Sequence, residues 1–305
     1  MFAAIDLGTN TALLLIGKVE EGKIQVVADI AELPRIGEGL GSASKISPQA
    51  LQRTIDVLKN YRKICEQHGV TKVAAITTAA VRKAENRNEV LQGIQNETGF
   101  VFEMISGEEE ARLCYLSAAH DFGEKILVLD IGGGSTEFMT VQKDFIAKSI
   151  PFGTVVLNEK FLNTIPPTQS SIELLREHLI EQLQNNIDPQ LYQAQSLTLI
   201  ATAGTPTSLA AVHLQLAEYD HDKVHGLKLS LETIQNLNKR LSTMTLAELK
   251  QVSGLHPKRA DVIVAGGIIL ESAMQHLGYA ELTVSDHGLR YGLFLDRFVK
   301  DSHEN

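Results

Sequence analysis

Residues 126–137 read ILVLDIGGGSTE, and residues 2–11 read FAAIDLGTNT, so one pattern is written twice in a chain of 305 residues. In each copy an apolar run ends at an aspartate, Asp130 or Asp6, and a glycine-rich turn leads into a second apolar run. This order predicts strand, tight turn and strand. A turn of glycine and hydroxyl residues gathers backbone N–H groups in one concavity, and such a nest binds phosphate oxygens. We therefore expect two domains that grip one phosphate chain between them.

Strand-like and helix-like segments alternate along the chain, which indicates the α/β class. The apolar β-type runs predict strands at 2–6, 12–19, 23–30, 73–77, 102–105, 126–130, 136–142, 145–150, 197–201 and 282–284. Helical spacing predicts helices at 48–68, 87–98, 107–120, 153–163, 168–186, 230–241, 246–251, 257–276 and 287–300. The echo between 2–31 and 126–150 indicates an internal duplication, and the polar break at 123–125 is the expected domain boundary.

The composition excludes several classes of protein. The net charge of −9 argues against a protein that coats nucleic acid, although a local basic cleft can still bind an anion. The two cysteines, Cys65 and Cys114, lie in helical segments outside any CxxC pattern, which is typical of buried free thiols in a reducing compartment. The N-terminus has no targeting pattern and no membrane-length apolar run. We expect a cytoplasmic protein with neither a nucleic acid nor a membrane as partner.

The glycine turns are the first candidate site. Glycines between strands often serve the turn geometry alone. The run from Gly132 to Gly134 costs more chain entropy, and close approach of the backbone to a ligand is a reason for it. The predicted phosphate-binding residues are Gly8, Thr9, Asn10, Gly132, Gly133, Gly134, Ser135 and, from a third turn, Gly204 and Thr205.

An acidic helix start at 106–111 supplies a candidate base. Ser106 and Glu109 have the spacing of a capping box, and Glu108 and Glu109 suit the positive end of a helix. Glu110 lies one step past the cap and needs neither explanation. A glutamate there could orient and deprotonate a water molecule.

Carboxylates and cations complete the candidate set. Asp6, Asp130 and Glu137 would repel a phosphate unless a divalent cation intervened, which predicts Mg²⁺, with Mn²⁺ as the alternative. Arg82, one turn after a strand end, is the best phosphate-binding cation. His221 and His225 are four residues apart, but without an HExxH pattern the zinc signal is weak.

Taken together, the motifs resemble the exopolyphosphatase / guanosine pentaphosphate phosphohydrolase (Ppx/GppA) family, within the sugar kinase/heat-shock chaperone/actin superfamily. The resemblance runs over nearly the full length, and the blocks that carry it are 6–10, 78–82 with Asn86, 105–113, 129–137, 203–210, 224–226, 259–261 and 285–290. Tyr291 is a departure, because the family often has glutamate there.

The resemblance implies two actin-like (ribonuclease H-like) domains, each a mixed sheet flanked by helices, with a cleft between them. We expect the first at 1–122, with the C-terminal helix at about 287–305 packed back onto it, and the second at 123–286. The resemblance also implies that Glu110 is the catalytic glutamate, that Arg82 clamps phosphate, that residues 8–10 and 132–135 bind phosphate, and that Asp130 and Glu137 hold the metal or position water.

The implied activity is Mg²⁺-dependent hydrolysis of the terminal phosphate of inorganic polyphosphate, with guanosine pentaphosphate as the alternative substrate. In this mechanism Glu110 aligns a water molecule for in-line attack, helped by Glu137. Three alternatives stay open: a guanosine pentaphosphate 5′-phosphohydrolase, a kinase that carries an acceptor alcohol, and a non-catalytic sensor of polyphosphate or guanosine phosphates. A homodimer also stays open.

Overall fold

The computed structural model describes residues 1–192 and 197–299 and divides into two compact units. Unit 1 holds residues 1–117 and the segment that begins at Leu289; unit 2 holds residues 118–288. The division falls inside helix α5 (Gly107–Phe122), which contributes to both units. Residues 300–305, which the sequence places in the C-terminal helix, lie outside the described residues.

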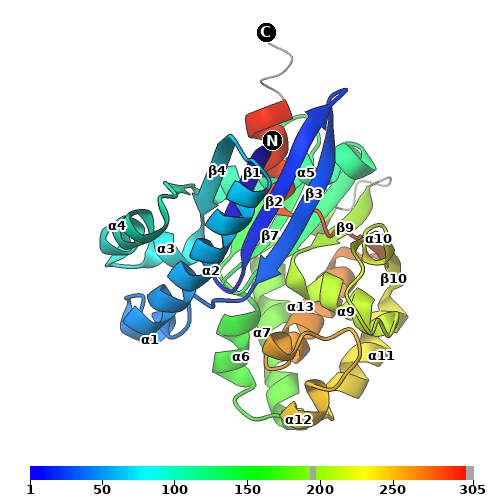
Figure 1. Ribbon diagram of the computed structural model, residues 1–305. Coiled ribbons are helices and arrows are strands. Elements are labelled where there is room, and N and C mark those ends of the chain that lie inside the picture. The colour runs from blue at the N-terminus through cyan, green and yellow to red at the C-terminus, as the bar shows by residue number, and fades with distance from the viewer. Residues whose placement is uncertain (193–196, 300–305) are drawn as a thin grey trace. The chain divides into compact units, whose positions relative to one another are not determined.

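Unit 1 is a mixed sheet with helices on both faces (Figure 1). Its described elements are β1 (Phe2–Leu7), β2 (Ala12–Glu20), β3 (Lys23–Glu32), α1 (Leu40–Ala43), α2 (Pro48–Gln67), β4 (Lys72–Thr77), α3 (Ala79–Lys83), α4 (Arg87–Thr98), β5 (Glu103–Met104), most of α5, α14 (Leu289–Phe294) and the π-helix η2 (Leu295–Val299). The strand order is β3-β2-β1-β4-β5. Strand β2 is antiparallel to both β1 and β3, so the meander predicted from the sequence is confirmed, and β1 is parallel to β4.

The two faces of β1 follow from its alternation of side chains. Ala3, Ile5 and Leu7 are fully covered and belong to the core that α2 closes. The Tyr61 hydroxyl of α2 donates to the Ala12 carbonyl oxygen at 2.7 Å, which fixes this helix to the sheet. Helix α2 starts as predicted, because Ser47 caps it and Pro48 occupies its first turn.

The opposite face of β1 is covered by α14 and η2. The rings of Phe2 and Phe298 stack with centroids 4.7 Å apart. A Cβ on Gly292 would lie 1.9 Å from the Leu113 carbonyl oxygen, so α14 crosses α5 where only glycine fits.

Arg290 also ties α14 to the meander. It donates to both carboxylate oxygens of Asp29 at 2.7 and 2.8 Å, and the Tyr291 hydroxyl donates to Asp29 at 3.0 Å. The tyrosine that departs from the family pattern therefore completes the hydrogen bonding of a buried ion pair.

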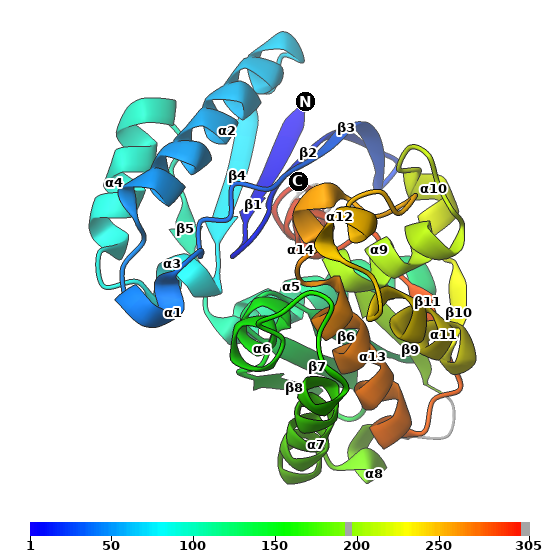
Figure 2. The same cartoon turned by 90° about the horizontal axis from the view of Figure 1, so that it is seen from below.

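Unit 2 repeats this architecture. Its described elements are β6 (Ile126–Ile131), β7 (Thr136–Val141), β8 (Phe145–Ile150), α6 (Thr154–Phe161), α7 (Gln169–Asn186), α8 (Pro189–Tyr192), β9 (Thr198–Thr202), α9 (Gly204–His213), α10 (His221–Val224), β10 (Lys228–Ser230), α11 (Leu231–Leu241), α12 (Leu246–Leu249), the 3₁₀-helix η1 (Pro257–Arg259), α13 (Ile263–Leu277) and β11 (Glu281–Val284). The buried helix α13 lies against the sheet near β6, between α7 and α11 (Figure 2).

The order of strands demonstrates the duplication. Unit 2 has the order β10-β11-β9-β6-β7-β8, so β8-β7-β6-β9-β11 matches β3-β2-β1-β4-β5 of unit 1, and β10 is added at the edge. Strand β6 is antiparallel to β7 and parallel to β9, as β1 is to β2 and β4. The predicted fold class, two mixed sheets flanked by helices, is confirmed. The cleft between the domains stays a prediction.

Both cysteines are buried and outside any disulfide, as the sequence indicates. Burial raises the pKa of the Cys65 thiol to about 11, so it is a packing residue rather than a nucleophile. In residues 1–192 and 197–299, we find no helix that combines the length and apolar character needed to cross a membrane.

Candidate active site

The turn after β1 is closed by a hydrogen bond from the Gly8 N–H to the Thr11 carbonyl at 2.9 Å. A loop after the meander packs onto it. The Gly37 N–H donates to the Thr9 carbonyl at 2.9 Å, and the Arg35 N–H donates to the Asn10 carbonyl at 3.0 Å. A Cβ on Gly37 would lie 2.4 Å from the Thr9 methyl carbon, so this approach requires glycine.

The turn after β6 has the same internal bond, from the Gly132 N–H to the Ser135 carbonyl at 3.0 Å. Here the first turn of α6 packs onto it. The Thr154 N–H donates to the Gly132 carbonyl and the Val155 N–H to the Gly133 carbonyl, each at 3.0 Å. A Cβ on Gly153 would lie 2.5 Å from the Gly133 carbonyl carbon.

These bonds set the direction of the turn amides. In a trans peptide the C=O of one residue and the N–H of the next point to opposite sides. When the carbonyls of Thr9, Gly132 and Gly133 are held by the supporting segment, the N–H groups of the residues that follow point away from it. Both turns therefore present amides on the side where an anion can bind.

The third predicted turn lies beside the second. Gly204 and Thr205 begin α9, directly after β9. A Cβ on Gly266 of α13 would lie 2.3 Å from the Thr205 hydroxyl oxygen and 3.0 Å from the Thr154 methyl carbon, so the third turn and the helix start that supports the second turn meet at one glycine. A Cβ on Gly204 would lie 1.6 Å from an Arg259 guanidinium nitrogen, which places a cation against the start of α9.

Carboxylates and hydroxyls line the same edge of this sheet. Asp130 pairs with Glu137 on β7 and with Thr202 on β9. Glu137 is 9% exposed and accepts a hydrogen bond from the Ser149 hydroxyl at 2.7 Å. The Thr202 hydroxyl is buried and has no hydrogen-bond partner among the described residues. Oxygen donors of this kind suit Mg²⁺, which prefers carboxylates and water.

Asp6 occupies the matching place in unit 1, at the end of β1, and is 7% exposed. Its predicted role beside Asp130 and Glu137 depends on how the two units are placed, and it stays a prediction.

Glu110 lies in the first turn of α5 and pairs with Arg82 of α3. The Arg82 Nη1 to Glu110 Oε2 distance is 3.3 Å, and Nη1 also donates to the Ile105 carbonyl at 2.8 Å. Both side chains keep partial contact with solvent, at 30% and 22% exposure. The predicted base and the predicted phosphate clamp are thus neighbours.

The capping box predicted for α5 is half formed. The Ser106 hydroxyl accepts from the Glu109 N–H at 3.1 Å. The Glu109 carboxylate binds Arg112 through two hydrogen bonds of 2.8 Å, and Arg112 continues to Asp296 at 2.9 Å. The hydrogen bond with Arg112 lowers the pKa of Glu109, while burial works in the opposite direction. Glu109 is structural, and the Glu110 side chain pairs with Arg82 instead.

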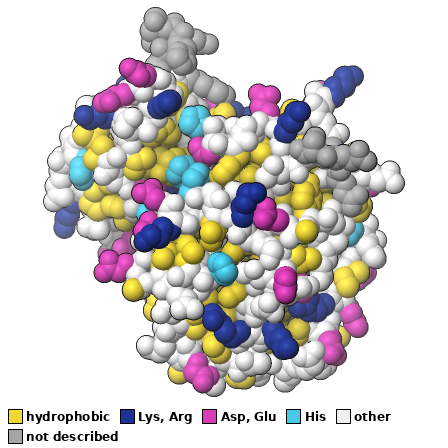
Figure 3. Space-filling view, turned by 90° about the vertical axis from the view of Figure 1, so that its right-hand side faces the viewer, with side chains coloured by type: hydrophobic (Ala, Val, Ile, Leu, Met, Phe, Trp, Pro, Cys, Tyr) yellow, Lys and Arg dark blue, Asp and Glu magenta, His cyan; other side chains and the backbone are white. Residues whose placement is uncertain are grey.

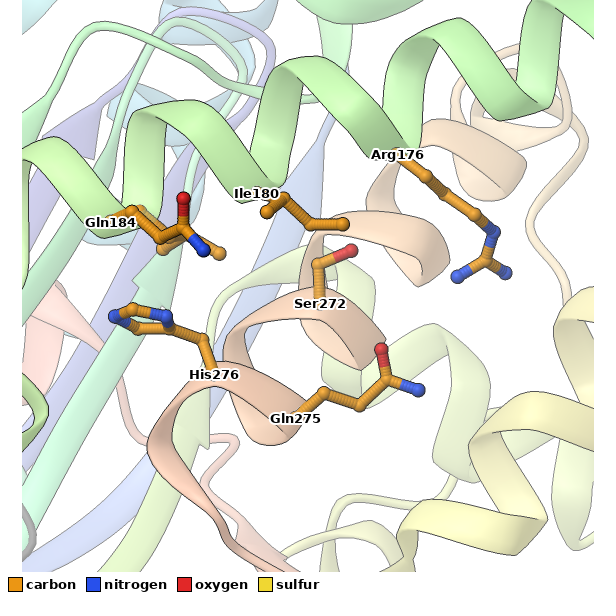
Figure 4. Close-up of a pocket in the computed structure, with 7 residues that line it drawn as sticks. Arg176, Ile180, Gln184, Ser272, Gln275 and His276 are labelled. Carbon is orange, nitrogen blue, oxygen red and sulfur yellow. The ribbon is translucent and has the colours of Figure 1, made fainter.

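A hollow of about 290 Å³ between α7 and α13 is a poor phosphate site (Figure 4). Its one arginine, Arg176, already binds both carboxylate oxygens of Glu271 at 2.8 Å. Its histidine, His276, contacts the Ile187 carbonyl at 2.9 Å.

Sequence reasoning did not assign site roles to the residues that support the turns. Gly37, Gly153 and Gly266 each touch a predicted turn, and Arg259 touches the third. Arg259 could have been found, because it lies in the RAD block of the family pattern. The supporting glycines carry no local signal.

Comparison with known proteins places the chain. The model of the Ppx/GppA phosphatase family matches residues 15–301. The chain is 31% identical to a bifunctional 3-dehydroquinate synthase/phosphatase of Fusobacterium nucleatum, over 96% of the chain but 46% of that protein, so it spans less than half of this relative. It is 30% identical to exopolyphosphatase 2 of Mycobacterium tuberculosis, over 96% of the chain and 97% of that protein. The crystal structure of the Aquifex aeolicus Ppx/GppA family member superimposes with a TM-score of 0.83 at 30% identity, over 99% of this chain and 98% of that one.

Proposed function

This chain belongs to the Ppx/GppA phosphatase family, and from that membership we propose that it hydrolyses the terminal phosphate of inorganic polyphosphate. The resemblance inferred from the motifs is confirmed at the level of the family. The predicted enzyme class, a hydrolase, agrees with it.

The observation that carries the proposal is the repeated, supported turn. Gly8 and Gly132 make the same internal hydrogen bond, and each turn has its carbonyls bound from one side. Amides held in one direction bind phosphate oxygens without rearrangement. A phosphate chain carries oxygens on several successive phosphates, so it is a ligand that more than one such turn can bind.

Glu110 supplies the base in this mechanism. Its carboxylate accepts a proton from a water molecule as the water attacks the terminal phosphorus in line. Arg82, itself held by the Ile105 carbonyl, keeps that carboxylate in place and carries charge that a phosphate oxygen can share. The leaving group is the shortened phosphate chain.

Asp130 and Glu137 would hold Mg²⁺, or Mn²⁺ in its place, which would neutralise charge on the phosphate oxygens. The buried Thr202 hydroxyl beside Asp130 supports an oxygen-rich site at this edge. The turn amides and Arg259 orient the rest of the chain.

Phosphate release from long-chain polyphosphate, tripolyphosphate, guanosine pentaphosphate and ATP, each with and without Mg²⁺, tests the proposal. We expect the highest kcat/KM with polyphosphate and little release without the metal. Preference for guanosine pentaphosphate would favour the alternative phosphohydrolase. Tight binding without turnover would favour the sensor, and a requirement for an acceptor alcohol would favour a kinase.

A further inference from the structure

Histidines and carboxylates gather at a second place in unit 2, away from the glycine turns in the sequence. Asp121 lies in the last turn of α5, His225 follows α10, and His287 follows β11. The face drawn in Figure 3 shows histidine side chains beside acidic ones. Three segments that are distant in the sequence bring these side chains together.

The geometry of the three side chains is that of a ligand set. His287 Nδ1 lies 2.9 Å from Asp121 Oδ2, and His225 Nε2 lies 3.9 Å from the same oxygen. One ligand atom of each residue lies within 4.8 Å of the other two. Ligand atoms bound to one zinc ion at about 2.0–2.2 Å lie roughly 3.3–3.6 Å apart in a tetrahedron. Small movements of the three side chains would therefore bring their ligand atoms to the spacing that one zinc ion requires.

The neighbourhood of the His225 ring favours a cation. The carboxylates of Asp121, Asp286 and Asp222 all act on this ring. The His225 and His287 rings stack with centroids 4.0 Å apart, and a nitrogen of each ring lies 3.9 or 2.9 Å from Asp121 Oδ2.

Access and support are also present. The three side chains are 16–26% exposed, so an ion can reach them from solvent. His120 contacts the other carboxylate oxygen of Asp121 at 3.1 Å, and a partner of this kind orients a ligating carboxylate.

We propose that Asp121, His225 and His287 bind one divalent transition-metal ion, of which Zn²⁺ is the expected case. Two imidazoles and one carboxylate suit such an ion, whereas Mg²⁺ takes oxygen ligands. Three protein ligands leave at least one position for water. Its three ligands are different residues from those of the Mg²⁺ site proposed at Asp130 and Glu137.

One contact must change when the ion binds. His225 Nδ1 lies 3.4 Å from the Asp286 backbone nitrogen. That separation is longer than the roughly 2.7–3.2 Å of an ordinary N–H hydrogen bond, so it holds the tautomer weakly. Binding through Nε2 places the proton on Nδ1 and exchanges this contact for a metal bond.

Calorimetric titration of the metal-free full chain with Zn²⁺, in excess Mg²⁺, tests the site. The Mg²⁺ occupies the oxygen sites and leaves the imidazole site to zinc. We expect one Zn²⁺ per chain, and a loss of affinity of at least about tenfold in His225→Ala and in His287→Ala. Co²⁺ in place of Zn²⁺ should give a visible absorption band that both variants lose.

Two controls separate this site from others. His213→Ala removes an exposed histidine at the end of α9 and should leave zinc binding unchanged. The double variant Asp130→Asn, Glu137→Gln should also leave zinc binding unchanged. Loss of the proposed catalytic site can therefore be distinguished from loss of the zinc site. If the chain binds no zinc, or if both histidine variants bind it as tightly as the parent, the proposal is wrong. Circular dichroism checks that the variants are folded, and Asp121→Asn, which keeps the side-chain shape, supplies a third test.

Discussion

The Arg82 guanidinium of α3 lies 3.3 Å from the Glu110 carboxylate of α5, and the same nitrogen is fixed by the Ile105 carbonyl. A base that accepts a proton from water must be correctly oriented, and a neighbouring guanidinium can hold its carboxylate in place. Positioning and charge stabilisation both contribute to phosphoryl transfer. The pair also explains why Glu110, and not Glu109, is the candidate base. Glu109 is committed to Arg112.

Glu110→Gln should lose at least about a hundredfold in kcat, because the amide cannot accept the proton while its shape is kept. The melting temperature and the binding of a phosphate chain should stay near those of the parent. Steady-state phosphate release and calorimetric binding measure the two effects. Near-normal turnover would remove Glu110 from the role.

Arg82→Lys should lower kcat by about tenfold to a hundredfold, because lysine keeps the charge but its flexible ammonium does not hold the position of Nη1, which contacts both Glu110 and Ile105. The loss should be smaller than that of Glu110→Gln, and the double variant should be little worse than Glu110→Gln alone. Independent, multiplicative losses would show that Arg82 acts on the substrate without Glu110.

Gly153→Ala should weaken phosphate binding, because the new methyl group would lie 2.5 Å from the Gly133 carbonyl and push the turn out of shape. We expect KM to rise by about tenfold, the equivalent of roughly 1.4 kcal/mol. Gly93→Ala, with its nearest neighbour 3.8 Å away, is the matched control. An unchanged KM in Gly153→Ala would show that the turn tolerates displacement.

Gly292→Ala should destabilise the protein by about 1–3 kcal/mol, the usual cost of overpacking, because α14 and α5 touch at Leu113. Gly93→Ala, inside α4, should instead stabilise it by about 0.5–1 kcal/mol through helix propensity. Urea unfolding measures both. Equal effects of the two substitutions would contradict the close crossing.

Arg112→Gln should lower stability at neutral pH and much less in acid. The hydrogen bond from Arg112 lowers the pKa of Glu109 in the folded protein, so its contribution is present above the unfolded pKa of about 4.3 and is lost as the pH falls through the folded pKa. Unfolding free energies of parent and variant should therefore converge in acid. Arg240→Gln, at an exposed arginine of α11, is the control. A difference independent of pH would exclude this linkage.

The features that depend on neighbouring residues could be predicted from the sequence. The two meanders, their glycine turns and the Ser47 cap of α2 all follow from patterns a few residues long. The duplication was visible for the same reason, since each copy repeats its local pattern.

The features that join distant segments could not be predicted. Nothing near Gly153 indicates that Gly133 is its neighbour, because a glycine shows that space is needed but not what fills it. The pair His221 and His225 drew attention through their spacing, yet His221 contacts Asp286 while His225 lies with His287 and Asp121. The spacing of two histidines along the chain does not predict their contacts with a loop that follows another strand.

Unit 1 is built from two separate segments of the chain, and this affects folding during synthesis. Phe2 stacks on Phe298, and Gly292 meets Leu113, so the late segment covers one face of β1. A ribosome makes β1 early and that segment after the whole of unit 2. The nascent chain therefore lacks this cover for β1 until unit 2 has been made, the stage at which a chaperone would protect exposed apolar surface.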